Sequence, residues 1–197
     1  MPGTMRARQR EETRRTLLRA GRHLFATKGY GAVGLSEIVQ AAGVTKGALY
    51  HHFDSKAALF AAVLEQVQGE VGERVAAAAD TRSDPWDQLV TGCETFLSTC
   101  TDPELQRIML IDGPAVLGWH EWRALDAAAS ARHLGEALQQ LVDTGVIAPR
   151  PIEPLTHLLS GAMNEAALWL ATTSDPHALD ATTSTLCDLL DALRITR

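Results

Sequence analysis

The chain has 197 residues, 46% of them hydrophobic, which is enough for one or two domains with a buried core. It contains no run of about 18 apolar residues, and the N-terminal "MPGTMRARQREETRR" has no apolar stretch after its charges, so we expect neither a membrane span nor a secretory signal. The three cysteines (Cys93, Cys100 and Cys187) form no CxxC pair, and we expect them to be reduced, packed thiols of a cytoplasmic protein.

The formal net charge of −6 conceals a division along the chain. Residues 1–56 contain ten Lys and Arg against four Asp and Glu, whereas the remaining residues contain eight against 20. A basic N-terminal head joined to an acidic body predicts that only the head meets a polyanion.

The first part of the chain predicts a basic arm followed by a helix. Residues 1–10 are expected to be a flexible basic arm that stays disordered until it finds a partner. Apolar residues between Leu17 and Phe25 then recur at helical spacing and stop at "TKGYG", a glycine-rich break.

Two short helices follow. Apolar residues at i, i+3, i+4 and i+7 predict a helix over 35–42, closed by Gly43. Thr45 is a natural N-cap for a third helix over 45–53. Two short helices joined by a tight turn are typical of the helix-turn-helix plan, in which the second helix enters the DNA major groove.

The rest of the chain also predicts helices. Ser55 can cap a fourth helix with one long apolar stripe, and "ADTRSDP" at 79–85 is the expected hinge. Further helices are expected near 86–100, 103–111, 119–144, 153–172 and 177–193, with breaks at "TDP", "DGPAVLG", "DTGVIAPRP" and "TTSDP". The sequence therefore predicts an all-α protein with a three-helix head over 11–56, a connecting helix over 57–80, and a helical ligand-binding and dimerisation body over 81–197.

Two enzyme-like motifs lack their required context. "GYGAVG" matches GxGxxG, and Asp54 follows about 20 residues later, but a helix rather than a strand precedes it, which argues against a dinucleotide site. "HEWRA" at 120–124 begins like a zinc-binding HExxH but ends in Ala124. We therefore expect no metal, no cofactor and no enzymatic activity.

The stretch "VTKGALYHHF" presents polar groups outward when Leu49 and Phe53 face the core. Adjacent His51 and His52 point about 100° apart on a helix, so they cannot close on one metal ion unaided. A cation, a glycine, a phenol and an imidazole on one surface suit phosphate contacts. Ser55 and Lys56, at the start of the next helix, suit one more phosphate.

The run from Thr13 to Leu64, with "AAGVTKGALYHHF.SK..LF", resembles the DNA-binding head of TetR-family transcriptional regulators. "LIDGPAVLGWHEWRALD" and "GAMNEAALWLA" resemble ligand-binding parts of some members. The resemblance implies an all-helical dimer of about nine helices per chain, whose head binds operator DNA and whose body binds a small molecule that releases it. By position it implies DNA contacts by Thr45, Lys46, Gly47, Tyr50, His51, His52 and Lys56, with Tyr50, His52 and Lys56 on phosphates and residues 45–47 near base edges.

One position departs from the family pattern. The family often begins its second helix with Thr or Ser, whose hydroxyl caps the helix and can meet phosphate, but this chain has Gly34 there. Ser36 is included among the DNA-binding residues as its substitute.

The body contains two features with functional interpretations. Its last two helices are apolar on more than one side, so we expect them to form a four-helix dimer interface with a second copy, although packing within one chain remains an alternative. The expected interface residues are Leu155, Leu159, Ala162, Ala166, Leu186, Leu189, Leu190 and Leu193. Bulky and polar residues in the middle suit a pocket for a largely apolar or aromatic ligand, although a tryptophan at helical spacing is more often core than pocket. The expected pocket residues are Phe96, Met109, Trp119, Trp122, His133, Met163, Asn164 and Trp169.

The sequence as a whole predicts a homodimeric, ligand-responsive repressor that binds double-stranded operator DNA. Two other classes stay open. The first is a regulator that activates or needs its ligand to bind DNA. The second is a helical enzyme, small-molecule binder or partner-binding scaffold that makes no DNA contact through its head.

Overall fold

The computed structural model describes residues 2–195, with the side chains of residues 2–4 and 6 left aside. Over that range the chain is built from helices, and the β structure there is one isolated antiparallel bridge between Ile147 and Arg194. The predicted all-α class is therefore confirmed. The head comprises α1 (Pro2–Lys28), the 3₁₀ turn η1 (Tyr30–Ala32), α2 (Leu35–Ala42) and α3 (Lys46–His52), and α4 (Lys56–Ala79) leads into the body. The body comprises α5 (Pro85–Thr99), α6 (Pro103–Leu105), the π-helical η2 (Gln106–Asp112), α7 (Gly113–Leu117), α8 (Trp119–Ala128), α9 (Ser130–Asp143), α10 (Ile152–Thr172) and α11 (Ala178–Asp191).

Local capping signals define the head. The Thr45 hydroxyl accepts a hydrogen bond from the Ala48 N–H at 3.1 Å and starts α3, and the Ser55 hydroxyl accepts one from the Ala58 N–H at 3.0 Å and starts α4. Gly43 ends α2 in the left-handed conformation, with φ of 64°. The predicted positions of these short helices are confirmed to within a residue or two.

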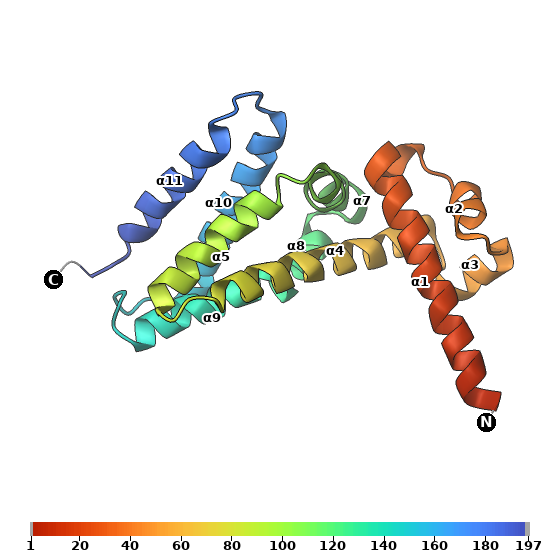
Figure 1. The fold of residues 1–197 in the computed structure, drawn as a ribbon, viewed down its shortest axis with the longest axis horizontal. Helices are drawn as coiled ribbons and strands as arrows, with labels where there is room; N and C mark the ends of the chain where they lie inside the picture. Colours follow the sequence, from red (N-terminus) through yellow and green to blue (C-terminus); the bar gives the residue numbers. More distant parts are fainter. Residues whose placement is uncertain (1, 196–197) are drawn as a thin grey trace.

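The prediction that residues 1–10 form a separate, flexible arm is wrong for the part that the structure describes. Residues 2–10 are the first turns of α1, which runs without interruption to Lys28 and projects beyond the rest of the head (Figure 1). The stretch from Thr4 to Ala20 contains no Gly or Pro, and an i,i+4 ion pair between Arg15 and Glu11 (Nε–Oε1 3.1 Å) supports the helix. Met1, the remaining residue of the predicted arm, lies outside the described residues.

Two predicted boundaries in the body are also wrong. The expected break over 112–118 is largely helical, since η2 leads directly into α7 and Pro114 lies in the first turn of α7, where no backbone donor is needed. Conversely, the helix expected over 119–144 is divided at Ala129, whose φ and ψ are both −107°. Gly72 of α4 lies against the backbone at this point, so the break is a feature of packing.

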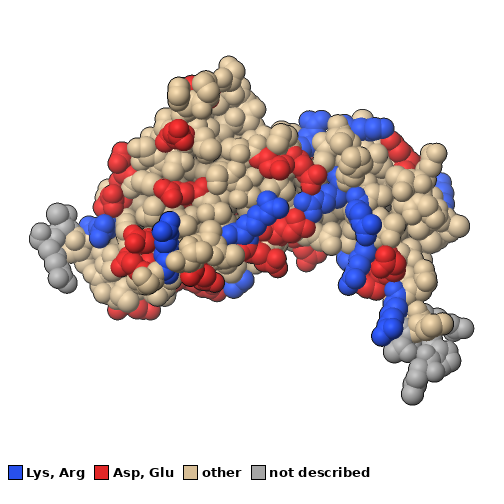
Figure 2. All heavy atoms as spheres, in the orientation of Figure 1, with Lys and Arg blue, Asp and Glu red and all other residues tan. Residues whose placement is uncertain are grey.

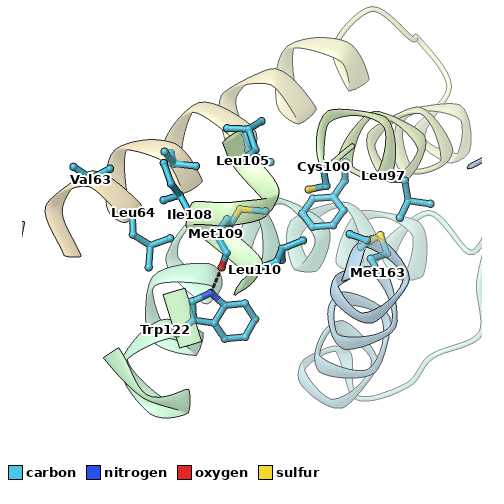
Figure 3. Close-up of a cluster of buried hydrophobic side chains, with 14 of the residues drawn as sticks. Val63, Leu64, Leu97, Cys100, Leu105, Ile108, Met109, Leu110, Trp122 and Met163 are labelled. Carbon is cyan, nitrogen blue, oxygen red and sulfur yellow. Dashed lines mark hydrogen bonds between the residues drawn. The ribbon is translucent and has the colours of Figure 1, made fainter. Parts of the chain in front are cut away.

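A continuous core joins head to body through α4. The apolar residues on the inward face of α4 are fully buried from Leu59 through Val71. They contact α1 at one end of α4, and α5, η2 and α9 further along. Figure 3 shows Val63 and Leu64 of α4 beside Ile108 of η2. The Met109 carbonyl of η2 accepts a hydrogen bond from the Trp122 indole N–H at 2.7 Å (Figure 3). No helix in the described range is both long and apolar enough to cross a membrane.

Candidate nucleic-acid interface and pocket

The outward face of α3 carries most of the predicted DNA-binding residues. Leu49 is fully buried and fixes the rotation of the helix, so Thr45, Lys46 and Gly47 are exposed on its first turn. Tyr50 is 47% exposed one turn later, with the Lys46 ammonium 6.0 Å from its ring centroid. The cation and the phenol therefore form one accessible surface, beside a glycine that allows a backbone to approach closely.

The two histidines at the end of α3 form a polar edge rather than a metal site. Their ring centroids are 5.5 Å apart in an edge-on arrangement, with His51 exposed and His52 half-buried. Partial burial lowers the pKa of His52, and the positive fields of His51, Arg10 and Arg14 lower it further. Among the described residues no group of three His, Cys, Asp or Glu side chains is arranged to hold a metal ion.

The remaining two predicted DNA-binding residues are placed differently. Ser36 lies exposed on the first turn of α2, next to the Gly34 cap. Lys56 points inward, where its ammonium donates to the carbonyls of Tyr30 at 2.9 Å and Val33 at 3.0 Å and lies 4.0 Å from the Tyr30 ring centroid. In this structure Lys56 therefore stabilises the turn after α1.

Charges divide the molecule in space as they do in the sequence. Figure 2 shows Lys and Arg along α1, while Asp and Glu are spread over the visible face of the body. The head residues 1–56 carry a formal charge of +6 and the remaining residues −12. An approaching polyanion is therefore attracted to the head and repelled by the body.

Polar contacts that the sequence did not reveal join the head to the body. The Arg22 guanidinium donates to Glu70 of α4 and to Glu104 of α6, each at 2.6 Å. The Asp112 carboxylate at the end of η2 accepts from the Tyr30 N–H at 2.8 Å. The head is thus attached to α4 and to two body elements, α6 and η2, and no local pattern marks these residues, because their partners are 48 to 82 positions away.

A small apolar pocket lies between α4, α5, α9 and α10, with a volume of about 60 Å³. Three predicted pocket residues, Phe96, His133 and Met163, line it. The sequence did not single out the other lining residues, because most are alanines, glycines and aliphatic residues that periodicity assigns to helix packing. They are Val75, Ala76, Ala79, Gln88, Leu89, Gly92, Cys93, Ser130, Ala131, Leu134, Ala137 and Ser160.

The other five predicted pocket residues do not line this pocket. Met109 and Trp122 are buried in the core beside η2, whereas Trp119 is 62% exposed and Trp169 is 50% exposed. Asn164 is buried close to the pocket-lining Ser160, and both side chains donate hydrogen bonds to the Asp126 carboxylate (Ser160 at 3.2 Å, Asn164 at 3.5 Å). Burial raises the pKa of Asp126, and its ion pair with Arg123 and these hydrogen bonds oppose that rise.

The last two helices present an apolar outer face. Leu158 of α10 is 72% exposed, and Trp169 (50% exposed) and Leu189 (58% exposed) line a groove of about 310 Å³ between α10 and α11. Of the predicted interface residues, Ala162, Ala166, Leu186 and Leu189 line this groove, and Leu155, Leu159 and Leu193 are half-buried. Leu186 and Leu190 are 7% and 0% exposed, so they pack inside the protomer and leave almost no surface for a second chain.

Two of the three cysteines, which the sequence predicts to be mostly packed, are buried. Burial raises the pKa of Cys93 and of Cys100 to about 12, so both are protonated at neutral pH, and Cys187 is half-buried. None of the three forms a disulfide in the structure.

A helix-turn-helix head on a helical body with its own pocket defines the class of DNA-binding transcriptional regulators. Residues 17–63 match the family model for bacterial regulatory proteins of the tetR family, and residues 86–193 match the tetracyclin repressor-like C-terminal domain. The chain therefore belongs to the TetR family of transcriptional regulators, which is a family of regulators rather than enzymes.

Individual relatives agree with this assignment. The crystal structure of a TetR-family transcriptional regulator from Pectobacterium atrosepticum is 36% identical with a TM-score of 0.79, over 95% of this chain and 97% of that one. The Transposon Tn10 TetC protein of Escherichia coli is 27% identical over 77% of this chain and 76% of its own length. The HTH-type transcriptional activator FasR of Mycolicibacterium smegmatis is 39% identical over 44% of this chain and 40% of its own length, so this chain spans less than half of that relative.

Proposed function

We propose that the protein is a cytoplasmic homodimeric repressor, released from its operator by a small, largely apolar or aromatic effector. The single observation that carries the DNA-binding part is the exposed surface of α3, where Lys46, Gly47 and Tyr50 are presented by a helix whose other face is locked by Leu49. This surface lies on the cationic head, and the second helix of a helix-turn-helix pair is the one that enters the major groove.

A salt titration of DNA binding tests this part. The probe is the duplex immediately upstream of the protein's own coding sequence, followed by fluorescence anisotropy from 50 to 300 mM salt. Wild type is expected to bind with a steep salt dependence, and Lys46→Ala combined with Tyr50→Ala is expected to abolish binding. Arg74→Ala, which removes an exposed cation from α4, serves as the control and should leave binding unchanged.

The outer face of α10 and α11 supports the dimer. An exposed tryptophan and an exposed leucine that line an apolar groove, with exposed Leu158 on the same helix α10, are unfavourable in water and suit the same helices of a second copy. Trp169→Arg should convert the dimer to monomers in sedimentation experiments. Trp119→Arg changes an equally exposed tryptophan elsewhere and should leave the dimer intact.

The size of the pocket supports a coupling between effector and head. About 60 Å³ is far below the roughly 300–1,000 Å³ of ordinary ligand sites, so an effector must widen the pocket to bind. Val75, Ala76 and Ala79 of α4 line it, and α4 continues into the head, where Arg22 is bonded to Glu70. Widening the pocket would therefore displace α4 and change the spacing of the two heads, which must match half-sites about 34–36 Å or a multiple apart.

A pair of neighbouring alanines on α4 tests the pocket. Ala76→Leu fills it and should prevent release from DNA by any small aromatic compound that releases wild type, with DNA binding itself preserved. Ala77→Leu places the same side chain on the exposed side of α4 and should respond like wild type.

Activation is the second candidate for the direction of regulation, since the relative FasR is named an activator. If an effector strengthens rather than weakens operator binding in the same titration, the protein is a regulator that needs its ligand, and the repressor assignment is rejected.

A further inference from the structure

The inward face of α1 changes its chemical character along the helix. Positions 10, 14, 17, 21 and 25 follow one another at three- and four-residue spacing, so they share one face. Leu17, Gly21 and Phe25 on this face are buried in the head core. Towards the N-terminus the same face continues as Arg14 and then Arg10, where an apolar stripe becomes a cationic one.

This arginine face, Arg10 and Arg14, lies beside the end of α3. The Arg14 guanidinium is 5.6 Å from the ring centroid of Phe53, and both arginines are close enough to His52 to act on its charge. Arg14 is half-buried and Arg10 is exposed. Within the described residues neither forms an ion pair, since Glu11 pairs with Arg15 instead (Nε–Oε1 3.1 Å), although Glu11 is also near enough to His52 to act on its charge.

The position of α1 continues the α3 surface outward. Figure 1 shows the N-terminal half of α1 running past α3 and beyond the rest of the head, where it has no neighbouring element of its own chain. A helix advances about 1.5 Å per residue, so Arg10 lies about 6 Å further out than Arg14. The two guanidinium groups thus extend in a row from the edge of the α3 surface.

We propose that the arginine face of α1 is a second phosphate-binding surface, which holds the DNA backbone next to the end of α3. The inference rests on the proposed DNA-binding function and adds a contact outside the helix-turn-helix. Two adjacent, unpaired guanidinium groups fit phosphate oxygens in charge and in donor geometry. The acidic body of a second copy also has the charge to bind these arginines. A contact with that body would not account for the position of the arginines beside α3, the helix proposed to enter the DNA groove.

The salt dependence of DNA binding distinguishes this surface. With two such arginines in each protomer, Arg10→Gln combined with Arg14→Gln removes four contacts per dimer. The slope of log K against log salt should then become shallower by roughly 3 to 4, at about 0.9 per contact. The probe is the duplex immediately upstream of the coding sequence, beside an unrelated duplex of equal length.

Matched variants separate this contact from a general effect of charge. Arg15→Gln combined with Arg19→Gln removes the same charge from the opposite, exposed side of α1, and should change the slope by less than about 1. Arg10→Lys combined with Arg14→Lys keeps the charge and should keep most of the slope. Because Arg14 also packs on Phe53, Arg10→Gln alone is measured too, and about half of the double effect is expected from it.

Three outcomes overturn the inference. If wild type binds DNA and the Arg10, Arg14 double variant keeps the wild-type slope, the second surface does not exist and the proposed function stands. If the double variant instead weakens dimerisation at unchanged slope, the arginines meet the partner's body. If wild type binds neither duplex at 50 mM salt, the proposed function and this inference both fail.

Discussion

The role of Lys56 can be decided by one substitution. Position alone suggests a phosphate contact, whereas the structure directs its ammonium to the carbonyls of Tyr30 and Val33. Lys56→Met keeps the length of the side chain and removes both charge-assisted hydrogen bonds. Each such bond is worth about 1.5–3 kcal/mol when buried, and discounting for the half-exposed site leaves a loss of about 2–3 kcal/mol in unfolding free energy.

Thermal unfolding followed by circular dichroism measures this loss. For a chain of this length, about 2–3 kcal/mol corresponds to a fall in Tm of roughly 5–10 °C. Lys46→Met is the control, since Lys46 is exposed on α3, and it should leave Tm nearly unchanged while the salt slope of DNA binding becomes shallower by about 0.9 per protomer. The reasoning is refuted if Lys56→Met leaves Tm unchanged and alters the salt slope as much as Lys46→Met does.

Three further predictions concern the head. Gly34→Thr should stabilise α2 by a few tenths of a kcal/mol and tighten DNA binding severalfold in the anisotropy assay, because the backbone at Gly34 is extended and an added Cβ meets none of the described atoms within 4 Å. An unchanged affinity would argue against a phosphate contact at this N-cap. DNA binding should strengthen as pH falls from 8 to 6, by up to about tenfold per pH unit for each proton taken up, because a DNA phosphate would raise the lowered pKa of His52 in the complex. An affinity that does not change with pH, or a pH dependence that persists in His52→Gln, contradicts this. Gly29→Ala should lower the unfolding free energy by about 1–3 kcal/mol in urea titrations, since φ at Gly29 is 79°, while Gly31→Ala in the same turn should change it by less than about 0.5 kcal/mol. Equal effects of the two substitutions would show that the backbone conformation of Gly29 is not the cause.

The head was predictable from the sequence because its signals are local. Thr45 and Ser55 cap the helices that follow them within three residues, and Gly43 supplies the left-handed end of α2. The four-residue spacing of Leu49 and Phe53 sets the rotation of α3, and that rotation alone determines that Lys46 and Tyr50 face outward.

The body was predictable in content and less so in detail. Helical periodicity indicates that a leucine faces something apolar, but it does not distinguish its own chain from a partner. In α11, Leu190 turned out to be fully buried and Leu189, one position away, 58% exposed. The same limit applies to the pocket, where Phe96 lines the cavity but Trp122 bonds to the Met109 carbonyl.

The sequence by itself determined the helix-turn-helix, its cationic outer surface and the acidic body, since capping, periodicity and charge depend on residues a few positions apart. Only the tertiary structure decided the direction of Lys56 and the division at Ala129 against Gly72. These features depend on which distant surfaces meet. Contacts between residues far apart in the chain produce no periodic pattern in the sequence.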